Sequence, residues 1–380
     1  MNILFVTEDS FQNENLNGVT KINYNLIKHF NDHDVFNLFL YSNSEVKKSN
    51  AYGCGVTNRG KSKLRSLLSS RPFMFLSDEN AKLLASKIIE LEHSFDVIHL
   101  SAFGLSPVAD YLDDRIRQKI FFSAIDSLSL FFNRRFKVET NLIKKGLYFL
   151  ESKKAELAEK KYFKKFKINH FVSDTDLNHV QAWCKDGIFI QNGVDIDYFS
   201  FNHNPIDKKT ITFTGNMNYG PNVDAVLHFS REILPKLWKQ IPDLTFYVVG
   251  NKPSEEIKSL SKKDNRIVVT GFVEDIREYL KKTSLYISPL RLGAGIKNKV
   301  LEAMAIGTPI IASSLSLEGI KTDQIEVADT DDQWVEKIHN FFNSNEDSRV
   351  RTLASRDLIV KEYSWEFVAN EYLKEYQKLL

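Results

Sequence analysis

The stretch from Pro289 to Ser313 constrains the fold of this chain more than any other. An apolar run at 284–288 precedes it, and within it a helix-forming segment and a Gly-Thr-Pro stop lead to a second apolar run at 310–312. This order is typical of strand, glycine loop, helix and strand, which form one turn of a parallel βαβ unit. The sequence therefore predicts an α/β fold with a parallel sheet.

The loop before the predicted helix has the features of an anion site. Gly293 and Gly295 remove two side chains there, so a ligand can approach the backbone N–H groups at the helix N-terminus. Free N–H donors and the helix dipole both favour negative charge. Lys297 and Lys299 add mobile positive charge, and Arg291 offers a planar fork suited to phosphate. The structural alternative is a tight loop with solvated lysines. The sequence GAGIKNK is not a P-loop, because it lacks the four-residue gap and the Lys-Ser/Thr ending.

Glu302, one turn into the same helix, cannot favour phosphate and is better explained as an acceptor for sugar hydroxyls. The whole segment resembles the nucleotide-sugar motif of the retaining glycosyltransferases of family 4. In that motif two glutamates separated by seven residues are followed by Ala-Met-Ala, a Gly and a Pro. Glu302-Ala-Met-Ala and Gly307-Thr-Pro match its second half, whereas the first glutamate falls on Ala294. A branch that builds bacterial surface polysaccharides has lysines in this loop and no first glutamate, as here.

The resemblance implies a GT-B fold, in which two facing Rossmann-like domains each contain a doubly wound parallel sheet and a C-terminal helix crosses back. A chain of 380 residues with 43% apolar residues can fill two such cores. The segment 191–195, Gln-Asn-Gly-Val-Asp, is similar to the family's interdomain crossover. We therefore expect an acceptor-side domain at 1–194, a nucleotide-sugar-binding domain at 195–363, and a helix at 364–380 that returns to the first domain.

Apolar runs alternate with helical patterns between Thr210 and Ser288, which favours a parallel, doubly wound sheet in the second domain. Glycines close three of these strands, at the edge where such sheets bind ligands. The turn at 271–273 resembles the one that holds the nucleotide base in the family. The resemblance thus implies a nucleotide-sugar site made of Gly215, Asn216, Gly250, Phe272, Val273, Arg291, Gly293, Ala294, Gly295, Lys297, Lys299 and Glu302. Lys297 and Glu302 are its candidate catalytic residues.

In the first domain the resemblance implies three acceptor-side residues. Gly18 stands in the loop after the first strand, His99 lies in the strand at 95–100, and Asp126 follows the strand at 119–124. Asp126 is also our third candidate catalytic residue. Each has a structural alternative. Gly18 could merely ease a helix start, His99 could be a buried strand histidine, and Asp126 could be the N-cap of the next helix. The region 42–71, rich in Ser, Asn, Lys and Gly, is expected to be dominated by loops.

The segment 133–167 contains twelve Lys or Arg residues against four Glu, interleaved with large apolar side chains. Such a helical stretch can lie on an anionic membrane surface, where each basic residue contributes on the order of 1 kcal/mol. The alternative is a solvated helix with an ordinary core stripe. Since the net charge is only +2 and no nucleic-acid module is recognisable, we expect no nucleic-acid partner.

Composition also limits cofactors and location. Cys54 and Cys184 are solitary, and His29 and His33 lack the carboxylate of a zinc motif, so we expect no metal and no disulfide. No run approaches the roughly 20 apolar residues of a membrane span, and the N-terminus lacks the pattern of a secretory leader. We therefore expect a cytoplasmic protein that can act at the inner face of the plasma membrane.

These observations lead to one prediction of function. The chain is predicted to be a hexosyltransferase that moves a sugar, with retention, from a UDP- or GDP-linked donor to a glycan or lipid-linked glycan. The resemblance implies that this reaction belongs to bacterial polysaccharide or lipopolysaccharide biosynthesis. Because fold does not determine function, an epimerase of the same architecture and a non-catalytic nucleotide-sugar-binding subunit stay open as alternatives.

Overall fold

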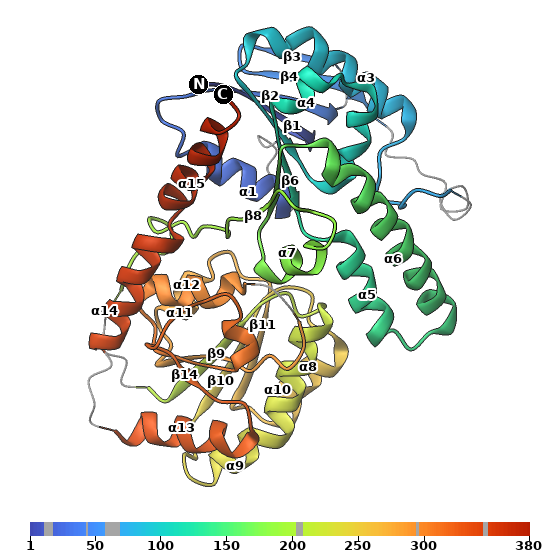
Figure 1. Cartoon of the computed structure of the whole chain (residues 1–380). Coiled ribbons are helices and arrows are strands. Elements are labelled where there is room, and N and C mark those ends of the chain that lie inside the picture. The colour runs from blue at the N-terminus through green and yellow to red at the C-terminus, as the bar shows by residue number, and fades with distance from the viewer. Residues whose placement is uncertain (11–17, 43–44, 58–68, 203–207, 294–295, 345–348) are drawn as a thin grey trace. The chain divides into compact units, whose positions relative to one another are not determined.

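The computed structural model describes residues 1–10, 18–42, 45–57, 69–202, 208–293, 296–344 and 349–380. The chain divides into two compact units (Figure 1). The first unit contains Met1–Gly193 and Val368–Leu380, and the second contains Val194–Phe367. The first division, after Gly193, lies one residue from the boundary predicted after residue 194. The second, after Phe367, lies four residues from the boundary predicted after residue 363.

A sheet of eight strands forms the centre of the first unit among the described residues, in the order β3-β4-β2-β1-β5-β6-β7-β8. Its strands are β1 (Asn2–Asp9), β2 (Asp34–Tyr41), β3 (Glu45–Lys48), β4 (Ala51–Val56), β5 (Val97–Ser101), β6 (Ile120–Ile125), β7 (Ile168–Phe171) and β8 (Gly187–Phe189). All neighbouring pairs are parallel except β3 and β4, which pair antiparallel at the edge of the sheet.

This edge pair corrects one expectation. The loop prediction for 42–71 is wrong for 45–48 and 51–56, which are strands. In β4, Tyr52 pairs in parallel with Leu38 of β2, so the neighbouring strand supplies the hydrogen bonds. A composition rich in Ser, Asn, Lys and Gly predicts little strand by itself, and the sheet edge overrides that local preference.

Helices cover both faces of this sheet. They are α1 (Gly18–Ile27), α3 (Asp78–Leu91), η1 (Glu92–Ser94), η2 (Phe103–Tyr111), α4 (Asp114–Gln118), α5 (Leu128–Val138), α6 (Leu142–Tyr162), η3 (Phe163–Lys165), α7 (Asp174–Val180) and α15 (Trp365–Gln377). Leu4 and Val6 of β1 belong to the core shared with α3, η2 and α6. Phe5 points to the other face, where its ring lies 6.2 Å from that of Phe30, just after α1. Side chains alternate along a strand, so β1 has two buried faces, as expected for a doubly wound sheet.

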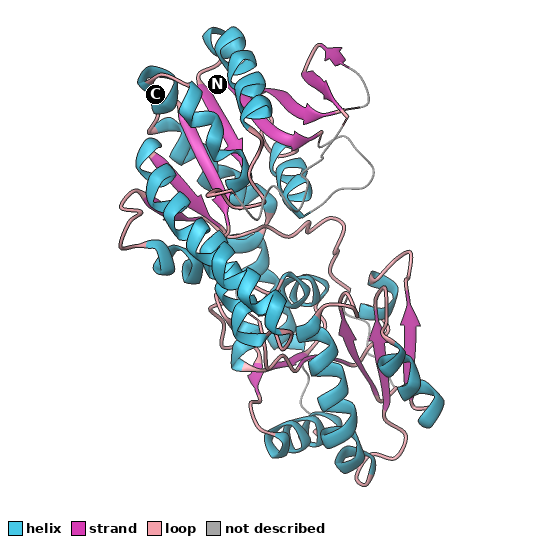
Figure 2. Cartoon of the chain, turned by 90° about the vertical axis from the view of Figure 1, so that its right-hand side faces the viewer, coloured by secondary structure: helices cyan, strands magenta, loops and turns pink. Residues whose placement is uncertain are grey.

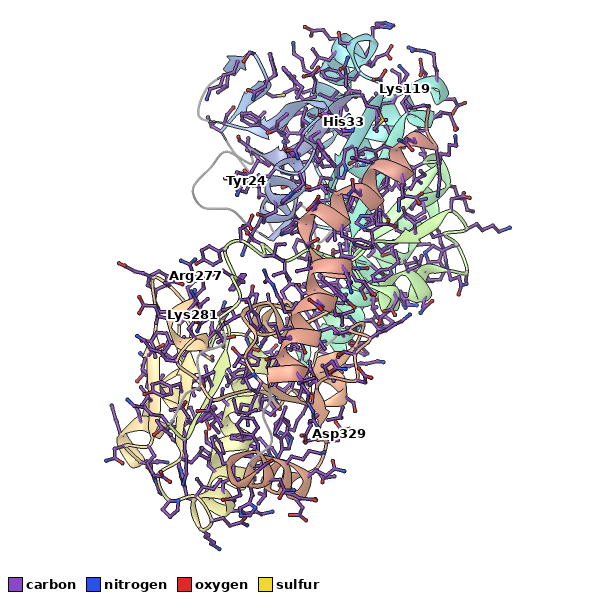
Figure 3. The ribbon with its side chains drawn as sticks, turned by 90° about the vertical axis from the view of Figure 1, so that its left-hand side faces the viewer. Tyr24, His33, Lys119, Arg277, Lys281 and Asp329 are labelled. Atoms are coloured by element: carbon purple, nitrogen blue, oxygen red, sulfur yellow. The ribbon has the colours of Figure 1, made fainter. Side chains whose placement is uncertain are left out.

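The last helix, α15, packs on the first unit, which confirms the predicted return of the chain (Figure 3). The hydroxyl of Tyr376 in α15 forms a hydrogen bond of 2.6 Å with Nδ1 of His99. The ring of Tyr376 lies 5.0 Å from that of Phe121. Tyr372 lies one turn earlier, with its hydroxyl 3.2 Å from Nε2 of His170. All of these side chains are buried. The packing of these buried rings and the hydrogen bonds of the two tyrosines therefore hold α15 against the sheet, while Nε2 of His99 has no hydrogen-bond partner among the described residues.

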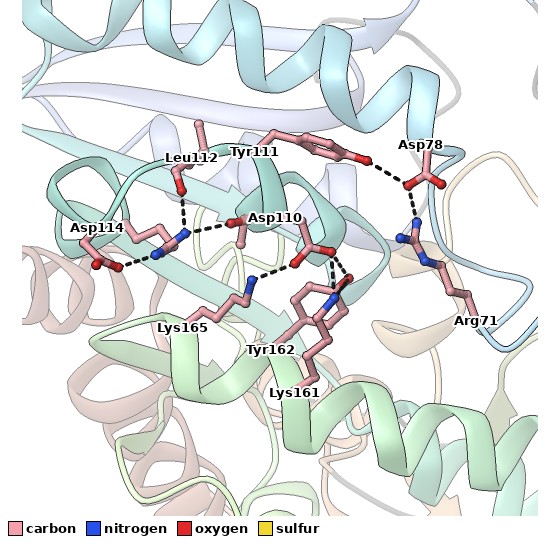
Figure 4. A network of polar contacts seen from close by, with 11 residues as sticks. Arg71, Asp78, Asp110, Tyr111, Leu112, Asp114, Lys161, Tyr162 and Lys165 are labelled. Carbon is pink, nitrogen blue, oxygen red and sulfur yellow. Dashed lines mark hydrogen bonds and ion pairs between the residues drawn. The ribbon is translucent and has the colours of Figure 1, made fainter.

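The C-terminal end of α6 is tied to η2 by a polar network (Figure 4). The carboxylate of Asp110 accepts hydrogen bonds from Lys161 at 2.7 Å, Tyr162 at 2.8 Å and Lys165 at 2.6 Å. Burial alone would raise the pKa of Asp110, but these donors lower it to about 2. The carboxylate therefore stays ionised and anchors the helix at neutral pH.

The second unit contains a six-stranded sheet among the described residues, in the order β11-β10-β9-β12-β13-β14, and all of its pairs are parallel. Figure 2 shows strands and the helices that pack around them in the chain. The strands of this sheet are β9 (Thr210–Thr214), β10 (Thr245–Val249), β11 (Ile267–Gly271), β12 (Leu285–Ser288), β13 (Ile310–Ala312) and β14 (Glu326–Val327). This is the order 3-2-1-4-5-6 of the Rossmann fold, with a switch of direction between β9 and β12.

The helices of the second unit again lie on two faces. They are α8 (Gly220–His228), the π-helical turn η4 (Phe229–Ile233), α9 (Leu234–Trp238), α10 (Glu255–Lys263), α11 (Arg277–Leu280), α12 (Asn298–Ile306), η5 (Ser314–Leu317), α13 (Asp331–Asn343), α14 (Arg349–Leu358) and the π-helical turn η6 (Ile359–Tyr363). Ile287 of β12 packs in one core with α8, α9 and α13. Tyr286, its neighbour, packs in the other core with α12. The predicted parallel sheet of this domain is confirmed.

Candidate functional site

Two backbone segments meet at the carboxyl edge of the second sheet. Gly215 follows β9 and Gly250 follows β10, with φ angles of +155° and +146°. A Cβ atom on Gly250 would lie 1.7 Å from the carbonyl oxygen of Gly215, so no side chain fits between the two segments. The predicted alignment of strand-closing glycines is therefore a direct backbone contact, and the side chains of Asn222 and Lys299 lie beside it at Gly215.

Lys299, at the start of α12, reaches this glycine edge. Its Nζ donates to Oδ1 of Asn222 at 2.6 Å and lies 4.2 Å from the centre of the Phe213 ring. Asn222 in turn donates to the carbonyl of Asn216 at 3.0 Å, so the turn after β9 orients the lysine. Burial lowers the pKa of Lys299 to about 7, against the opposing charge of Glu302. Its amine is therefore poised to take up a proton when an anion arrives.

Lys297 is the N-cap residue of α12, and its side chain is only 8% exposed. Its Nζ lies 3.6 Å from Oε2 of Glu318, and its Cε lies 3.9 Å from the place a Cβ of Gly293 would occupy. The expectation that these lysines are mobile is wrong, because both are held by neighbouring side chains. Ala294 and Gly295, also assigned to this loop, lie outside the described residues.

Glu302 is partly exposed, so it does not point into a closed core. Its charge contributes to raising the pKa of Tyr286, after the larger effect of burial. The hydroxyl of Tyr286 lies 3.0 Å from that of Thr214 at the end of β9. The carboxylate is thus near the ends of β9 and β12, where the strand order switches, and its role as an acceptor for sugar hydroxyls stays a prediction.

Arg291 is engaged elsewhere in the unit. Its Nε and Nη2 atoms donate to the two carboxylate oxygens of Asp224 at 3.0 and 2.7 Å. The guanidinium group that we assign to the diphosphate therefore already binds the carboxylate of Asp224, and a phosphate would have to compete with that carboxylate.

The remaining predicted residues of this edge lie in turns. Phe272 is 74% exposed and follows Gly271, whose φ is +71°. Val273 is partly buried beside it. The side chain of Asn216 accepts from the backbone N–H of Asn218 at 3.1 Å and so closes its own turn. Contact of this region with a nucleotide base stays a prediction.

The first unit has a pocket of about 380 Å³ at the carboxyl ends of β1, β5 and β6. The chain continues from β1 to β2 on one side and reaches β5 on the other, so this is again a switch point where open sheets bind ligands. Carboxylates of Glu8, Asp9 and Asp126 line it together with apolar side chains. Gly18 begins α1, whose next residues Val19 and Thr20 line the pocket, and its acceptor role stays a prediction.

Two lining residues have unusual backbone angles. Ala102, after β5, has a φ of +92°, and Ile125, at the end of β6, has a φ of +71°. A positive φ is a genuine outlier for a β-branched residue such as Ile125. Strain of this kind costs on the order of 1–3 kcal/mol per residue and gathers at functional sites. The outliers therefore support a functional role for this pocket.

Asp126 lies at the wall of this pocket with an accessible carboxylate. Surrounding protein atoms and the charge of Asp176 raise its pKa to about 6, while Arg134 acts in the opposite direction. The alternative role as an N-cap is wrong, because Ser127 caps α5 by accepting from the backbone N–H of Leu130.

Buried carboxylates hold the turn that contains Asp126. The backbone N–H of Ser127 donates to Asp176 at 2.8 Å. Glu159 of α6 accepts from the backbone N–H of Ser129 at 2.9 Å and from its hydroxyl at 2.6 Å. These contacts satisfy the donors at the start of α5 and orient the neighbouring turn.

His99 does not belong to the pocket, and its assignment to the acceptor side is wrong. Its ring is 1% exposed and stacks 4.3 Å from Phe5 and 5.2 Å from Phe121. Burial keeps its pKa well below the usual value, so it is a neutral core residue that positions α15.

Sequence reasoning missed several residues of the pocket. Glu8 and Asp9 stand directly after the apolar run of β1, a signal that the sequence does contain. Phe131 and Met74 also line the pocket, but they come from segments far apart in the chain. No local sequence pattern predicts that these two residues lie at the same pocket. Within the described residues, no group of three or more His, Cys, Asp and Glu side chains could hold a metal ion.

Comparison with known families finds a match in the second unit. Residues 208–344 match the family described as glycosyl transferases group 1. The phosphatidyl-myo-inositol mannosyltransferase of Mycobacterium tuberculosis is 24% identical over 218 residues, which cover 52% of this chain and 56% of the relative. A protein of Klebsiella pneumoniae named as a 44.6 kDa protein in a cps region is 24% identical over 224 residues, 56% of each chain. The chain thus spans about half the length of the curated relatives it matches.

The structural likeness extends over the whole chain. The crystal structure of Anabaena Alr3699/HepE in complex with UDP matches 100% of both chains with a TM-score of 0.67 at 12% identity. At this identity the likeness concerns the fold. The chain therefore has the GT-B fold, and the match of its second unit to group 1 supports a glycosyltransferase of that type.

Proposed function

We propose that this chain is a hexosyltransferase that moves a sugar from a nucleoside-diphosphate donor to a glycan or lipid-linked glycan, with retention at the anomeric carbon. One observation supports this most. Lys297 is the N-cap of α12, Lys299 and Glu302 lie in its first turns, and Nζ of Lys299 reaches the backbone contact between Gly215 and Gly250. Cations at a helix N-terminus suit a diphosphate, and a nearby carboxylate suits sugar hydroxyls.

The proposed chemistry follows from these charges. Transfer needs stabilisation of a departing diphosphate and of an oxocarbenium-like sugar. Lys299 has a pKa of about 7 without ligand. The charge of an arriving diphosphate would raise this pKa, so that the amine takes up a proton from water and stays a cation beside the leaving group. Preorganised charge of this kind is the largest single term in many enzymes. In this proposal the lysines hold the diphosphate and no cofactor is used.

Asp126 is the proposed polar contact on the acceptor side. A carboxyl group with a pKa of about 6 can accept a proton from a hydroxyl near neutral pH, because general bases work best with a pKa near the working pH. We therefore expect activity to rise with pH through about 6, where Asp126 loses its proton.

The donor and pathway are proposed from the comparisons. UDP lies in the crystal structure of HepE, so UDP and UDP-hexoses are the first probes, with GDP and GDP-hexoses as the second set. A mannosyltransferase and a cps-region protein among the relatives support a role in bacterial polysaccharide or lipopolysaccharide biosynthesis.

A thermal-shift panel of UDP, GDP and their hexose derivatives tests donor binding, because a ligand at 100 times its Kd stabilises the fold by about 2.7 kcal/mol. Incubation of the best donor with oligosaccharide acceptors, followed by NMR of the anomeric proton, then tests transfer and retention. An epimerised donor formed without acceptor would indicate the epimerase alternative. Nucleotide binding without transfer or hydrolysis across the acceptor panel would indicate a non-catalytic subunit.

We also propose that the α5–α6 hairpin contacts an anionic membrane. Its tip presents Leu142 and Ile143 with 83% and 86% exposure, beside the exposed Lys137 and Lys144. The buried face of α6 contains Glu151, Ala155, Ala158, Glu159 and Tyr162 instead of these apolar residues. Tyr148 in the first half of the helix packs against the core, as the alternative of a core stripe requires, whereas the apolar tip with its basic neighbours suits a lipid surface. None of the helices in the described ranges combines the length and apolarity that a bilayer span requires.

Sedimentation with vesicles tests this contact. Replacing Leu142 and Ile143 together by Ser should weaken binding to vesicles with 30% phosphatidylglycerol at least tenfold, because each apolar side chain inserted into lipid contributes on the order of 1–2 kcal/mol. The control is Val350→Ser, which removes an apolar side chain with 74% exposure from the second unit. Equal binding of both variants would contradict the proposal.

A further inference from the structure

We infer that Asn222 is a positioning residue of the nucleotide-sugar site: its neutral amide holds Lys299 against the turn after β9 and leaves the positive charge of the amine to an anionic ligand. This inference rests on the proposed function, since it assigns a further residue to the diphosphate side of that site.

The amide of Asn222 is held in one orientation. Asn222 lies in the first turn of α8 and is 5% exposed. Its Oδ1 accepts from Nζ of Lys299 at 2.6 Å, and its Nδ2 donates to the carbonyl of Asn216 at 3.0 Å. An ammonium group only donates and a carbonyl only accepts, so a flipped amide would satisfy neither partner. Asn222 therefore links the turn after β9 to the start of α12.

Gly215 provides the space for this link. A Cβ atom at residue 215 would lie 2.6 Å from Nδ2 of Asn222 and 3.3 Å from Nζ of Lys299. The first of these distances is shorter than real Cβ contacts allow, so a side chain at residue 215 would displace the amide. The glycine that follows β9 and the asparagine of α8 thus serve the same lysine.

Arg291 provides a contrast within the same unit. It donates to both carboxylate oxygens of Asp224, two residues after Asn222 in α8, at 3.0 and 2.7 Å. A carboxylate neutralises the cation that it holds, whereas an amide only orients it. The start of α8 therefore holds one cation with a counter-charge and the other with a neutral group.

The surroundings of Lys299 leave room for an anionic partner. Nζ meets Asn222 of α8 and, at 4.2 Å, the centre of the Phe213 ring of β9, and both groups are neutral. Besides burial, the charged groups that act on the amine are Glu302, which favours its protonated form, and Lys297, which opposes it. A protonated amine has three N–H donors, and Asn222 accepts from one of them. A diphosphate can therefore bind Lys299 while Asn222 keeps it in place.

Calorimetry on Asn222→Asp tests the inference in the full chain, with UDP and inorganic pyrophosphate as probes from pH 6 to 9. The new carboxylate would pair with Lys299, compete with the diphosphate and raise the pKa of the lysine above its value of about 7. We expect the Kd at pH 7 to rise at least about tenfold, and the pH above which the Kd increases to move upward by at least about one unit. A purely structural role would weaken binding without moving the pH profile, and that result, or binding as in the parent, would overturn the inference.

The control Asn265→Asp makes the same chemical change at an exposed residue just before β11, at the opposite end of the sheet from the site. Its Kd should stay within about twofold of the parent across the pH range, because the new charge lies far from Lys299. A shift of the pH profile equal to that of Asn222→Asp would mean that any added charge suffices, which would contradict the role of Asn222.

Asn222→Ala removes both hydrogen bonds and adds no charge, so it tests the inference even where the Asp variant does not fold. We expect both probes to bind at least about threefold more weakly. In a chain that carries Lys299→Met, the same change should alter the Kd less than about twofold, because a positioning residue acts through its lysine. Equal losses in the two backgrounds, or no loss in the parent, would refute the inference.

The two probes also separate this inference from the proposed function. Pyrophosphate binding with the expected dependence on Asn222, without binding of UDP or GDP, would leave the inference standing and contradict the proposed donor. Nucleotide binding that the Asn222 variants do not change would do the reverse. If none of the three ligands binds, both are wrong.

Discussion

The two units use the same edge of a parallel sheet in opposite ways. In the second unit the edge is built from backbone, because Gly215 and Gly250 lie against each other, and its charged groups at the start of α12 include two lysines. In the first unit the edge is built from side chains and includes acidic groups such as Asp126. Ala102 there keeps a positive φ without being glycine.

In the proposed function, this difference lets one architecture serve two kinds of ligand. Both edges lie at a switch in strand order, where open sheets have a crevice. A glycine-lined, cationic edge suits a diphosphate that must approach the backbone closely. An edge with the carboxylate of Asp126 and apolar side chains suits a polyol.

The largest effect is expected from Gly250→Ala, which breaks the backbone contact of the second edge. The new Cβ would lie 1.7 Å from the carbonyl oxygen of Gly215. We expect a loss of at least about 3 kcal/mol in the free energy of unfolding, at or above the usual range for overpacking. Urea unfolding followed by circular dichroism measures it.

Gly271→Ala is the matched control for this change. Its φ is +71°, but no described atom lies within 4 Å of its added Cβ. The loss should be only the backbone cost of about 1–2 kcal/mol. If both variants lose the same stability, close packing is not what requires glycine at the second edge.

Lys299→Met removes the buried cation of the second edge and keeps a side chain of similar length. We expect kcat for transfer to fall about 100-fold at saturating donor, because a preorganised charge beside the leaving group is lost. A steady-state assay measures it. Lys282→Met, which changes a lysine with 79% side-chain exposure, should retain the full rate. A rate for Lys299→Met within threefold of the parent would remove Lys299 from the proposed site.

The pH dependence of nucleotide binding tests the same lysine without catalysis. Lys299 has a pKa of about 7 in the free chain, and a bound diphosphate would raise it. Below pH 7 the lysine is already protonated, so the affinity for UDP should be flat. Above pH 7 binding must take up a proton, so the Kd should rise by up to tenfold per pH unit. Calorimetry from pH 6 to 9 measures the profile, and Lys299→Met should flatten it.

The smallest effect is expected from Ala102→Gly at the first edge. Glycine tolerates the φ of +92°, so relief of strain should outweigh the greater freedom of the unfolded chain and stabilise the fold by about 1 kcal/mol or less. The control Ala109→Gly in η2, where φ is not positive, should destabilise it by a similar amount. Destabilisation by Ala102→Gly would show that this residue is not strained.

Much of the fold was predictable because it depends on local patterns. The alternation of apolar runs and helical spacing predicted the parallel sheet of the second unit. The return of the helix at 364–380 to the first domain was implied by the resemblance to family 4. The prediction failed at β3 and β4, whose composition favours loops and whose strand state depends on pairing with β2. Local propensity cannot report a partner that is distant in the chain.

The features of the candidate site also divide into those that the sequence revealed and those that it did not. Glycines such as Gly215 and Gly250 were found from sequence, because a glycine after an apolar run is visible as a pattern. The partners of the charged residues were not. Asn222 orients Lys299, Asp224 occupies Arg291, and a shell of aromatic rings buries His99.

By itself, then, the sequence determined which elements form, in what order, and which residue types stand at the ends of the strands. The tertiary structure alone decided which of those residues face a pocket, which are held by a counterion and which lose their charge. The physical reason is that burial and pairing depend on the distances between groups far apart in the chain. Burial raises the pKa of Asp126 and lowers that of Lys299. Neighbours that only the folded chain brings near act in addition, Asp176 in the same direction as burial and Glu302 against it.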